Sequence, residues 1–387
     1  MTAVSGRAVF LMPSSVSAAL LATSGGPWGT VHVKWDVAQE LGLIVGGTQG
    51  GEAGFERHTT FLDQHRSRYA DVLTDFGGWY RADAVLIDLW TDMQNRDAAL
   101  PVDVFKQHVP QGWKATPRDA VQLILTGAVI DGVHRWRAWN ANDRQVVPIE
   151  LFTVDENSDV LAPLDGLWPL EDLRSESAVL VGLGSLGTPA ALALAAYGIG
   201  RITLVDPDRL QQHNLVRHVL DQSYLGHFKV AGVRDLIQRR IPNIDVSALA
   251  LDVVLDADTI RPLIRDASIV IAAPDGVAPR QAVNHMARWG HTPAIFGAVF
   301  DDGGLGEVIR IRPDRSSACL SCHRVRLFRD ELLEPERTLD LGYGTGYVHR
   351  PMTAVGPDIG LVGDLVAKVA VATILEAAGH SDQAVPG

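Results

Sequence analysis

The chain has 387 residues, of which 47% are apolar and 21% charged, and its formal net charge is −12. This length favours two domains, and the apolar fraction is large enough for each to bury a core. The acidic balance argues against a nucleic-acid partner and against an anionic membrane surface. No run of about 18 apolar residues occurs, so no transmembrane helix is expected. Two cysteines in one CxxC pair fit a cytoplasmic protein.

Residues 1–165 are rich in tryptophan and alternate short apolar runs with Gly, Pro and Asp turns, a pattern typical of an α+β domain. Strands are predicted at VHVKWD, QELGLIVGG, VHRWRAWN and VVPIELFTV. A helix is predicted from Phe61 to Leu73. The segment GGWYRADAVLIDLW predicts either a strand pair or a strand followed by a helix. In TPRDAVQLILTG, Thr116 as N-cap and Pro117 at the first helical position predict a further helix.

Two segments of this region, LGLIVGG and GGWYRADA, are similar to segments of JAB/MPN domains, the metal-dependent deubiquitinase fold. In that family the second segment carries paired zinc-binding histidines, whereas Arg81 and Asp83 stand there in this chain. Glu40 is one residue out of register with the family's catalytic glutamate. The resemblance therefore implies a non-catalytic binding domain, and the alternative is an accessory domain that positions a protein substrate. Three scattered histidines are expected to be surface or core residues rather than ligands: His58, His65 and His108.

The stretch SESAVLVGLGSLGTPAALALAAYGIGRITLVDPD begins the second domain, which we place at residues 166–387. Residues 178–181 form a short apolar run typical of a buried parallel strand. Residues 188–197 are alanine-rich and predict a helix, and residues 201–205 predict a second strand. This order of elements predicts a βαβ unit.

The turn between the first strand and the helix contains Gly182, Gly184 and Gly187, which are spaced as GxGxxG. The first glycine permits a tight turn, the second lets backbone approach a phosphate, and the third lets helix and strand pack closely. The helix that follows directs its positive N-terminus at the phosphate. Asp206 ends the second strand and is placed to bind ribose hydroxyls. The motif in this context predicts a nucleotide-binding unit.

Polar residues further along the chain indicate which nucleotide is bound. They are Asp208 in DPD, Asn214 and Arg217 in QQHNLVRHVL, Lys229 after LGHF, and Asp275 at the end of the predicted buried strand SIVIAAPD. A nicotinamide enzyme has no need of this array. A triphosphate and its metal require several cations and a carboxylate. The array therefore favours ATP over NAD.

These motifs resemble the ThiF/MoeB/ubiquitin-activating superfamily of adenylating enzymes. Its pattern is GxGxxG, DxD, NLxRQ, GxxKa and a strand ending in aspartate. The match covers residues 175–377 and departs at His218, where the family usually has glutamine. The resemblance implies a Rossmann-like α/β fold with a doubly wound, mostly parallel sheet, separate from the N-terminal α+β domain. It also implies ATP and Mg²⁺ as cofactors.

The resemblance assigns a role to each motif residue. Arg217 and Lys229 contact the phosphates and Asp275 holds Mg²⁺, and these three are the predicted catalytic residues. Arg280 and Asn284, on the next predicted helix, are either ligands or structural supports. The predicted nucleotide-binding residues are Gly182, Gly184, Gly187, Asp206, Asp208 (or a turn cap in its case), Asn214, Arg217, Lys229 and Asp275.

The pair Cys319 and Cys322 leaves three interpretations open. Relatives often hold a structural zinc with one CxxC here and another near the C-terminus, but this chain has no second pair. His323 or His349 would have to complete a Zn²⁺ site. Alternatively, one cysteine accepts the activated substrate as a thioester, although the predicted crossover loop at residues 327–352 contains no cysteine. The third interpretation is an inert pair of reduced thiols.

The implied activity is ATP-dependent adenylation of the C-terminal carboxylate of a small ubiquitin-like or sulfur-carrier protein, with release of pyrophosphate. The JAB-like region favours a bacterial-type conjugation pathway, in which a conjugating enzyme is a further candidate partner. The family habit predicts a homodimer. Adenylating relatives usually carry an RYxRQ-like segment whose arginine reaches the partner's ATP, and this chain offers only Arg174 there.

Three other functions are alternatives. One is adenylation of a peptide in natural-product modification, as in microcin-type relatives, which would require a small N-terminal peptide clasp. Another is a nucleotide-binding scaffold without turnover, against which the intact Arg217, Lys229 and Asp275 argue. The last is an NAD-dependent dehydrogenase, which leaves NLVRH and Lys229 unexplained.

Overall fold

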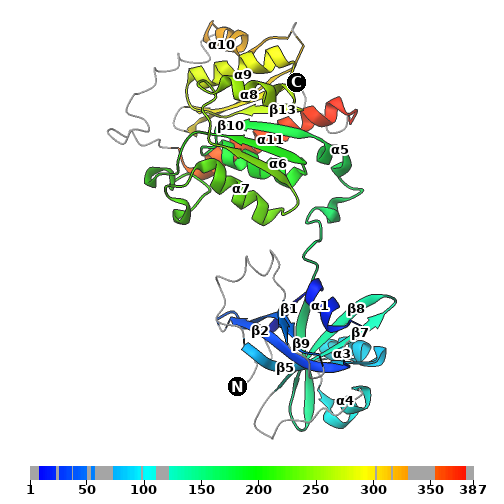
Figure 1. Cartoon of the computed structure of the whole chain (residues 1–387). Helices are drawn as coiled ribbons and strands as arrows, with labels where there is room; N and C mark the ends of the chain where they lie inside the picture. The colour runs from blue at the N-terminus through cyan, green and yellow to red at the C-terminus, as the bar shows by residue number, and fades with distance from the viewer. Residues whose placement is uncertain are drawn as a thin grey trace. The chain divides into compact units, whose positions relative to one another are not determined.

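The computed structural model describes residues 8–22, 26–36, 38–49, 54–56, 73–96, 99–109, 122–300, 303–314, 317–329 and 354–380. The chain divides into two compact units, Met1–Ser158 and Asp159–Gly387 (Figure 1). The sequence had placed the boundary after residue 165. Residues 159–165 belong to the second unit, because Leu161 packs against the same core cluster that contains Leu173 of α5 (Leu170–Ser175).

In the N-terminal unit, nine strands of the described residues form one sheet in the order β1-β3-β2-β5-β7-β8-β9-β6, with β4 beside β3. Strand β1 pairs in parallel with both β3 and β9, so the main path closes on itself as in a barrel. The strands are β1 (Val9–Pro13), β2 (Trp28–Asp36), β3 (Leu41–Gly47), β4 (Phe55–Glu56), β5 (Leu73–Arg81), β6 (Leu100–Pro101), β7 (Gln122–Ile130), β8 (Val133–Ala141) and β9 (Gln145–Val154). The helices are α1 (Ser14–Leu20), α3 (Ala84–Arg96) and α4 (Val102–His108).

Tryptophans form much of the core of this unit. Trp79, Trp136 and Trp139 are each at most 1% exposed. Their indole N–H groups donate to the carbonyl of Thr48, the hydroxyl of Ser17 and the hydroxyl of Thr126, each at 2.8 Å. A buried indole needs such a partner because an unpaired N–H would cost free energy. The tryptophan content of this region therefore reflects packing.

The predicted strands of this region are confirmed as β2, β3, β8 and β9, and GGWYRADAVLIDLW forms a strand followed by a helix, β5 and α3. The helix predicted at TPRDAVQLILTG is wrong from Gln122 onward. This segment is β7, which pairs with β5 on one side and β8 on the other. Leu123, Ile124 and Leu125 are all buried. Consecutive residues of β7 therefore face apolar surroundings on both sides of the sheet. The sequence of such a strand lacks alternation and cannot be distinguished from that of a buried helix by its periodicity. Residues 110–121 and most of the helix predicted from Phe61 lie outside the described residues.

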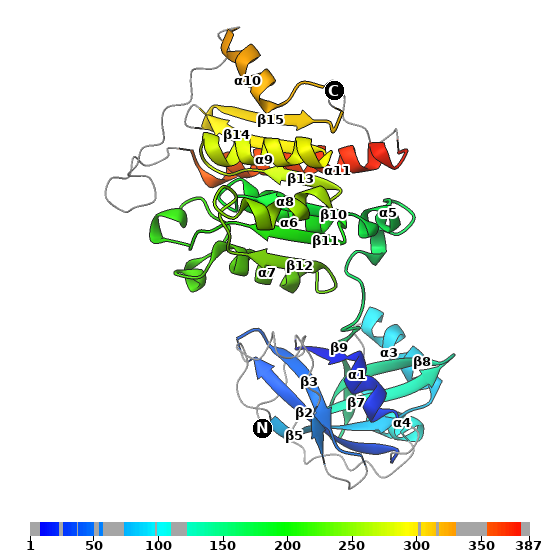
Figure 2. The same cartoon turned by 45° about the horizontal axis from the view of Figure 1, so that its top comes forward.

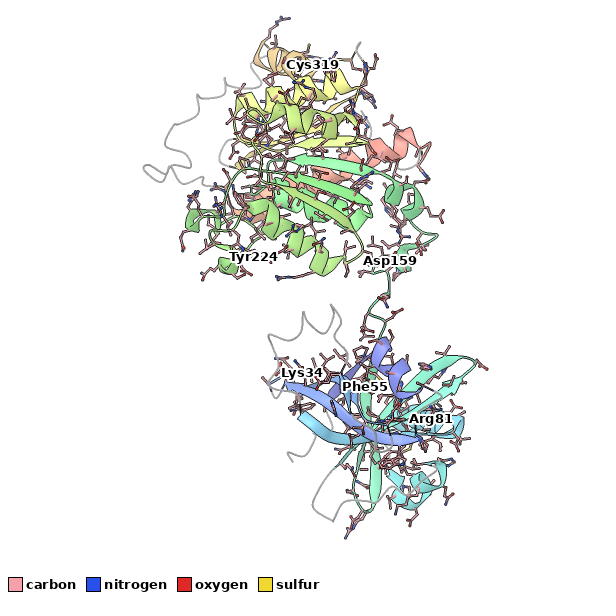
Figure 3. The ribbon with its side chains drawn as sticks, in the orientation of Figure 1. Lys34, Phe55, Arg81, Asp159, Tyr224 and Cys319 are labelled. Atoms are coloured by element: carbon pink, nitrogen blue, oxygen red, sulfur yellow. The ribbon has the colours of Figure 1, made fainter. Side chains whose placement is uncertain are left out.

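The positions that carry the JAB/MPN resemblance are engaged in local structure. The Arg81 guanidinium (labelled in Figure 3) donates to the backbone carbonyls of Leu21 and Ala22 at 2.9 and 2.6 Å. Asp83 accepts from the amide of Leu86 in α3 at 3.0 Å and lies 2.9 Å from His108 Nδ1. The similarity to JAB/MPN domains stays a prediction, and His58 and His65 lie outside the described residues.

The second unit is a mixed α/β structure with a parallel-rich sheet. Its strands are β10 (Ser177–Val181), β11 (Arg201–Val205), β12 (Asp245–Leu249), β13 (Ile269–Ala272), β14 (Ala294–Phe300) and β15 (Leu305–Ile311). The order is β12-β11-β10-β13-β14-β15, and Figure 2 shows the strands side by side in this order. All neighbours are parallel except β14 and β15. The βαβ unit predicted from the sequence is confirmed at β10, α6 (Gly187–Tyr197) and β11.

Helices cover both faces of this sheet (Figure 1). Leu180 of β10 packs in the core cluster shared with α6, α7 and α11, whereas its neighbours Val179 and Val181 pack in the cluster shared with α8 and α9. Successive residues of a strand point to opposite faces, so a strand covered on both sides must be apolar throughout. The helices are α6 (Gly187–Tyr197), α7 (Lys229–Arg240), α8 (Ala257–Arg265), α9 (Val277–Gly290), α10 (Leu320–Arg329) and α11 (Gly356–Ala377).

The last described helix, α11, is buried along much of its length. It packs against α6, where Gly363 allows close approach: a side chain there would lie 2.5 Å from the carbonyl oxygen of Leu186. The crossover loop predicted before it lies largely outside the described residues. Within the described part of the chain, no helix combines the length and apolarity that crossing a membrane requires.

Candidate functional site

The carboxyl ends of β10, β11 and β13 meet at one edge of the second sheet, because the three strands are parallel neighbours. Strand β10 lies between β11 and β13, and the connections after β10 and after β13 run to opposite sides. This reversal of strand order opens a crevice at the carboxyl ends of the strands. A cavity of about 520 Å³ lies here. All but one of the predicted nucleotide-binding residues line it: Gly182, Gly184, Asp206, Asp208, Asn214, Arg217, Lys229 and Asp275.

The glycine turn is held by close backbone contacts. Gly182 has φ 90°, and a side chain on it would lie 2.5 Å from the backbone nitrogen of Pro274. Gly187 does not line the cavity, and a side chain on it would lie 1.8 Å from the carbonyl oxygen of Gly182. Gly184 has nothing within 4 Å of its missing side chain and faces the cavity. The turn is therefore tightly packed at Gly182 and Gly187 and open toward the cavity at Gly184.

Asp206, at the end of β11, is a buried acid with a structural partner on each oxygen. Its Oδ2 accepts from the amide of Leu183 at 2.6 Å, and its Oδ1 accepts from the amide of Asp208 at 2.8 Å. Burial raises the pKa of this carboxyl, and the Lys229 ammonium partly opposes the increase. Asp206 thus ties the glycine turn to the segment that follows β11.

Lys229 is the first residue of α7, and its buried ammonium group lies close to three acidic residues. Its Nζ lies 2.8 Å from Asp208 Oδ2, and the lysine side chain is 9% exposed against 65% for the aspartate. Burial by itself would lower the pKa of Lys229, but Asp206, Asp208 and Asp275 raise it above its ordinary value. The cation is therefore retained inside the cavity at neutral pH.

The segment after Asp208 brings Asn214 and Arg217 to the cavity. A short 3-10 helix, Gln212–Asn214, begins with a capping box in which Asn214 Oδ1 accepts from the amide of Gln211 at 2.9 Å. The amide of Arg217 donates to the carbonyl of Asn214 at 3.0 Å. The backbone of Arg217 also lies against Gly356, the first residue of α11. Two separate elements thus fix this turn.

His218, where the resemblance leads one to expect glutamine, is 8% exposed and lines the same cavity. Its Nε2 lies 2.8 Å from the carbonyl oxygen of Leu183 and 3.3 Å from the hydroxyl of Thr188. Its Nδ1 accepts from the amide of Leu220 at 3.1 Å. Burial foremost, with the Lys229 and Arg217 cations, lowers the pKa of this imidazole.

The structure separates the two residues of α9 whose role the sequence left open. Arg280 lines the cavity, and its Nε donates to the carbonyl of Pro274 at 3.1 Å, beside Asp275. Asn284 is buried, and its Oδ1 accepts from the amide of Leu320 at 3.1 Å. Asn284 is thus a structural support for the start of α10, whereas Arg280 belongs to the cavity.

The Cys319–Cys322 pair lies at the beginning of α10, where Figure 3 labels Cys319. The two Sγ atoms are 3.6 Å apart. Burial alone would raise the pKa of the Cys319 thiol, but hydrogen bonds from Cys322 and Ser321 lower it below its ordinary value. Among the described residues, no group of three or more His, Cys, Asp or Glu is placed to hold a metal, so the structure does not support the predicted zinc site. His349 lies outside the described residues.

Sequence analysis missed several residues that line the cavity. Leu251, Asp252 and Val253 follow β12 and line it, as do Arg209 and His213. The rule that predicted Asp206 and Asp275 also applies to β12, because its carboxyl end lies at the same sheet edge. Asp252 also supports local structure, since its Oδ1 accepts from the amides of Val254 and Leu255 at 2.8 and 3.0 Å.

Comparison with known proteins now places the chain. The ThiF family profile matches residues 149–384, more than half of the 387 residues. The chain belongs to the ThiF family. The sulfur carrier protein ThiS adenylyltransferase of Escherichia coli K12 is 30% identical over 214 residues, which are 54% of this chain and 74% of that protein. The molybdopterin-synthase adenylyltransferase of Salmonella typhimurium is 30% identical over 202 residues, 52% of this chain and 74% of that protein.

A third relative is the SAMP-activating enzyme E1 of Haloferax volcanii, 28% identical over 151 residues, which are 39% of this chain and 54% of that protein. Among solved structures, E. coli MccB with ATP matches with a TM-score of 0.43 and 21% identity, covering 54% of this chain and 58% of that one. The family and its curated relatives classify the chain as a ThiF-type adenylyltransferase, an ATP-binding enzyme.

The cavity of this ThiF family member fits the nucleotide that its class uses. A triphosphate requires cations and backbone that can approach closely. Arg217 and Lys229 line the cavity and would supply the cations, and Gly184 leaves the turn open. Asp275 also lines it and would supply a carboxylate for Mg²⁺.

Proposed function

We propose that this chain adenylates the C-terminal carboxylate of a small ubiquitin-like or sulfur-carrier protein. In this reaction a carboxylate oxygen attacks the α-phosphorus of ATP, the bond from that phosphorus to the bridging oxygen breaks, and pyrophosphate leaves. The products are an acyl adenylate and pyrophosphate. The observation that carries the proposal is one cavity of about 520 Å³ lined by Arg217, Lys229, Asp275 and the open side of the glycine turn.

The chemistry asks for positioning and charge neutralisation more than for covalent participation of the protein. Lys229 and Arg217 would offset the charge that develops on the phosphates during attack. Asp275 would hold Mg²⁺ and Asp206 would bind the ribose. Asp206 already binds two backbone amides in this structure, so ribose would add to these contacts on an oxygen that retains acceptor capacity.

The substrate class rests on the relatives. Their names specify a sulfur carrier protein, a molybdopterin synthase and a SAMP, and the Haloferax enzyme is called an E1. A small carrier or ubiquitin-like protein is accordingly the proposed partner, in a sulfur-carrier pathway or in a bacterial-type conjugation pathway. The proposal extends to a homodimer, to a conjugating enzyme as a later acceptor, and to the N-terminal unit as a domain that positions the protein substrate.

A thermal-shift titration tests the nucleotide assignment. Mg-ATP and NAD are titrated separately into wild type and Asp275→Ala. A ligand at about 100 times its Kd adds roughly 2.7 kcal/mol, which raises the Tm of a unit of this size by a few degrees. We expect stabilisation by Mg-ATP alone, reduced in the variant. Stabilisation by NAD, or by neither nucleotide, would overturn the assignment.

Pyrophosphate exchange then tests the reaction. Labelled pyrophosphate is incorporated into ATP only when a carboxylate substrate is present, so a candidate carrier protein is compared with the same protein lacking its C-terminal residue. Arg217→Ala should retain the wild-type Tm and lose about 10²-fold or more in exchange rate. Exchange that does not depend on the carrier's C-terminus would exclude this substrate class.

A further inference from the structure

One buried side chain joins the glycine turn to the segment that carries Asn214 and Arg217. His218 Nε2 lies 2.8 Å from the carbonyl oxygen of Leu183, the residue between Gly182 and Gly184. Its Nδ1 accepts from the amide of Leu220 at 3.1 Å. The imidazole therefore spans two backbone groups that are distant in sequence and close to the cavity.

The two backbone partners determine the tautomer of this histidine. A carbonyl oxygen can only accept, so Nε2 toward Leu183 must carry the hydrogen. An amide N–H can only donate, so Nδ1 toward Leu220 must be bare. The neutral Nε2–H imidazole satisfies both groups, and the protonated imidazolium cannot, because it would direct a second N–H at the Leu220 amide.

The backbone of Leu183 is held on both sides of its Cα, because its N–H and its carbonyl each have side-chain partners. Its N–H donates to Asp206 Oδ2 at 2.6 Å, and its carbonyl also accepts from the Thr188 hydroxyl at 3.1 Å. Thr188, in the first turn of α6, is fully buried. Asp206 thus fixes the peptide group between Gly182 and Leu183, and His218 with Thr188 fixes the next one, between Leu183 and Gly184. Gly184 lines the cavity.

We propose that His218 is a positioning residue of the nucleotide site, whose neutral imidazole fixes the glycine turn against the Asn214–Arg217 segment and sets an acid limit on Mg-ATP binding. This inference rests on the proposed function, since it requires Mg-ATP to bind in this cavity. A glutamine side chain offers the same pairing, one N–H donor and one oxygen acceptor, so His218→Gln should preserve the bridge without a titrating group.

Two cations also oppose protonation of the imidazole. Within the described part of the chain, Lys229 from α7 and Arg217 from the histidine's own segment are the charged groups that lower its pKa, whereas the hydrogen bond to Leu183 raises it. The glycine turn and α6 present the Leu183 carbonyl and the Thr188 hydroxyl. A proton on Nδ1 would therefore meet two cations and an N–H donor. Since the pKa of the folded imidazole lies below the ordinary value of 6.5, Mg-ATP affinity should fall only as pH drops below 6.5 toward that lowered pKa.

The test is calorimetric titration of Mg-ATP from mildly alkaline to mildly acidic pH, on wild type, His218→Gln and His218→Leu. His227→Gln, whose side chain is exposed, is the matched control. We expect His218→Gln to bind within about 3-fold of wild type at alkaline pH, and His218→Leu to bind about 10-fold or more weakly, because it leaves the Leu183 carbonyl with one partner fewer and the Leu220 amide unpaired.

Protonation of ATP itself affects every variant equally, so the ratio of wild-type to His218→Gln affinity isolates the histidine. This ratio should fall at least several-fold toward acidic pH, while the ratio for His227→Gln stays flat. Parallel pH profiles, or full affinity in His218→Leu, would overturn the proposal while leaving ATP binding intact. Failure of wild type to bind Mg-ATP at any pH would instead overturn the proposed function, and this inference with it.

Nitrogen-15 spectra of the imidazoles give a second measurement that does not depend on the nucleotide. The signal that disappears in His218→Gln identifies the residue. We expect the Nε2–H tautomer and no protonation near pH 6.5. An Nδ1–H tautomer, or an ordinary titration, would overturn the proposal even if His218→Leu fails to fold.

Discussion

The ammonium group of Lys229 lies 2.8 Å from the carboxylate of Asp208, and both residues line the cavity that contains the glycine turn. The pair is unequal, because the lysine side chain is 9% exposed and that of the aspartate 65%. The buried acid Asp206 also depends on this cation, which opposes the effect of burial on its pKa. Lys229 therefore neutralises two carboxylates before any phosphate is present.

Replacing Lys229 with methionine should weaken both folding and nucleotide binding. The change leaves buried Asp206 without its neighbouring cation, at a cost of about 1–3 kcal/mol in the free energy of unfolding. It also removes the proposed phosphate contact, so Mg-ATP affinity should fall at least 10-fold. Chemical denaturation and calorimetry at neutral pH measure the two effects. Asp208→Asn is the control, because an exposed ion pair contributes about 0–1 kcal/mol; an equal loss of stability in both variants would contradict this assignment.

The glycine turn offers a matched pair of alanine substitutions. In Gly187→Ala the new methyl group would lie 1.8 Å from the carbonyl oxygen of Gly182, so we expect a loss of about 1–3 kcal/mol or more in the free energy of unfolding. In Gly184→Ala the methyl group meets no atom within 4 Å, so stability should change by less than about 1 kcal/mol.

Nucleotide binding should distinguish the same two variants. Gly184→Ala places a methyl group where the backbone faces the cavity, and we expect Mg-ATP stabilisation of the Tm to decrease sharply despite normal folding. The Tm is measured for each variant with and without Mg-ATP. A Gly184→Ala protein that responds to Mg-ATP as wild type does would remove this glycine from the nucleotide site.

The lowered pKa of His218 also predicts how stability depends on pH. Below the ordinary histidine pKa of 6.5, His218 is protonated in the unfolded chain but stays neutral in the folded chain until the pH reaches its lowered pKa. The stabilisation is therefore complete above pH 6.5 and is lost as pH falls from there toward the folded-state pKa, with a slope of at most about 1.4 kcal/mol per pH unit. His218→Gln should lack this component. Denaturation curves across the pH range measure it, and parallel wild-type and variant curves would disprove it.

The cysteine pair is predicted to react as a dithiol. Because the Sγ atoms of Cys319 and Cys322 are 3.6 Å apart, oxidation with a low-molecular-weight disulfide should join them. One thiolate attacks the reagent and releases one reagent thiol; the second cysteine then attacks the mixed disulfide at the protein sulfur and releases the other. Mass spectrometry should show the loss of two hydrogen atoms. Single Cys→Ser variants should stop at the mixed disulfide.

Elemental analysis of the same preparations tests the zinc interpretation directly. Zinc bound in equal molar amount to wild type, and absent from Cys319→Ser, would contradict the free dithiol and restore a metal site. Zinc present equally in both proteins would show that the metal binds elsewhere.

Much of the second unit was predictable because its signals are local. The apolar run at residues 178–181 and the glycine spacing require only neighbouring residues to indicate a strand, a turn and a helix. Strand-end acids such as Asp206 and Asp275 follow from the same local patterns, since parallel strands end at one sheet edge. The segment from Gln122 to Ile130 misled the prediction because a strand buried on both faces lacks the alternation that distinguishes it from a helix.

The sequence by itself determined which residue types are available: the GxGxxG turn, the acids at strand ends, and the cations Arg217 and Lys229. The tertiary structure decided how they are paired. Lys229 meets Asp208, and His218 meets Leu183, only because α6, α7 and the 3-10 turn pack around one sheet edge. Hydrogen bonds and ion pairs depend on distances of about 3 Å, and distances between residues far apart in the chain are fixed by packing, which no local pattern encodes.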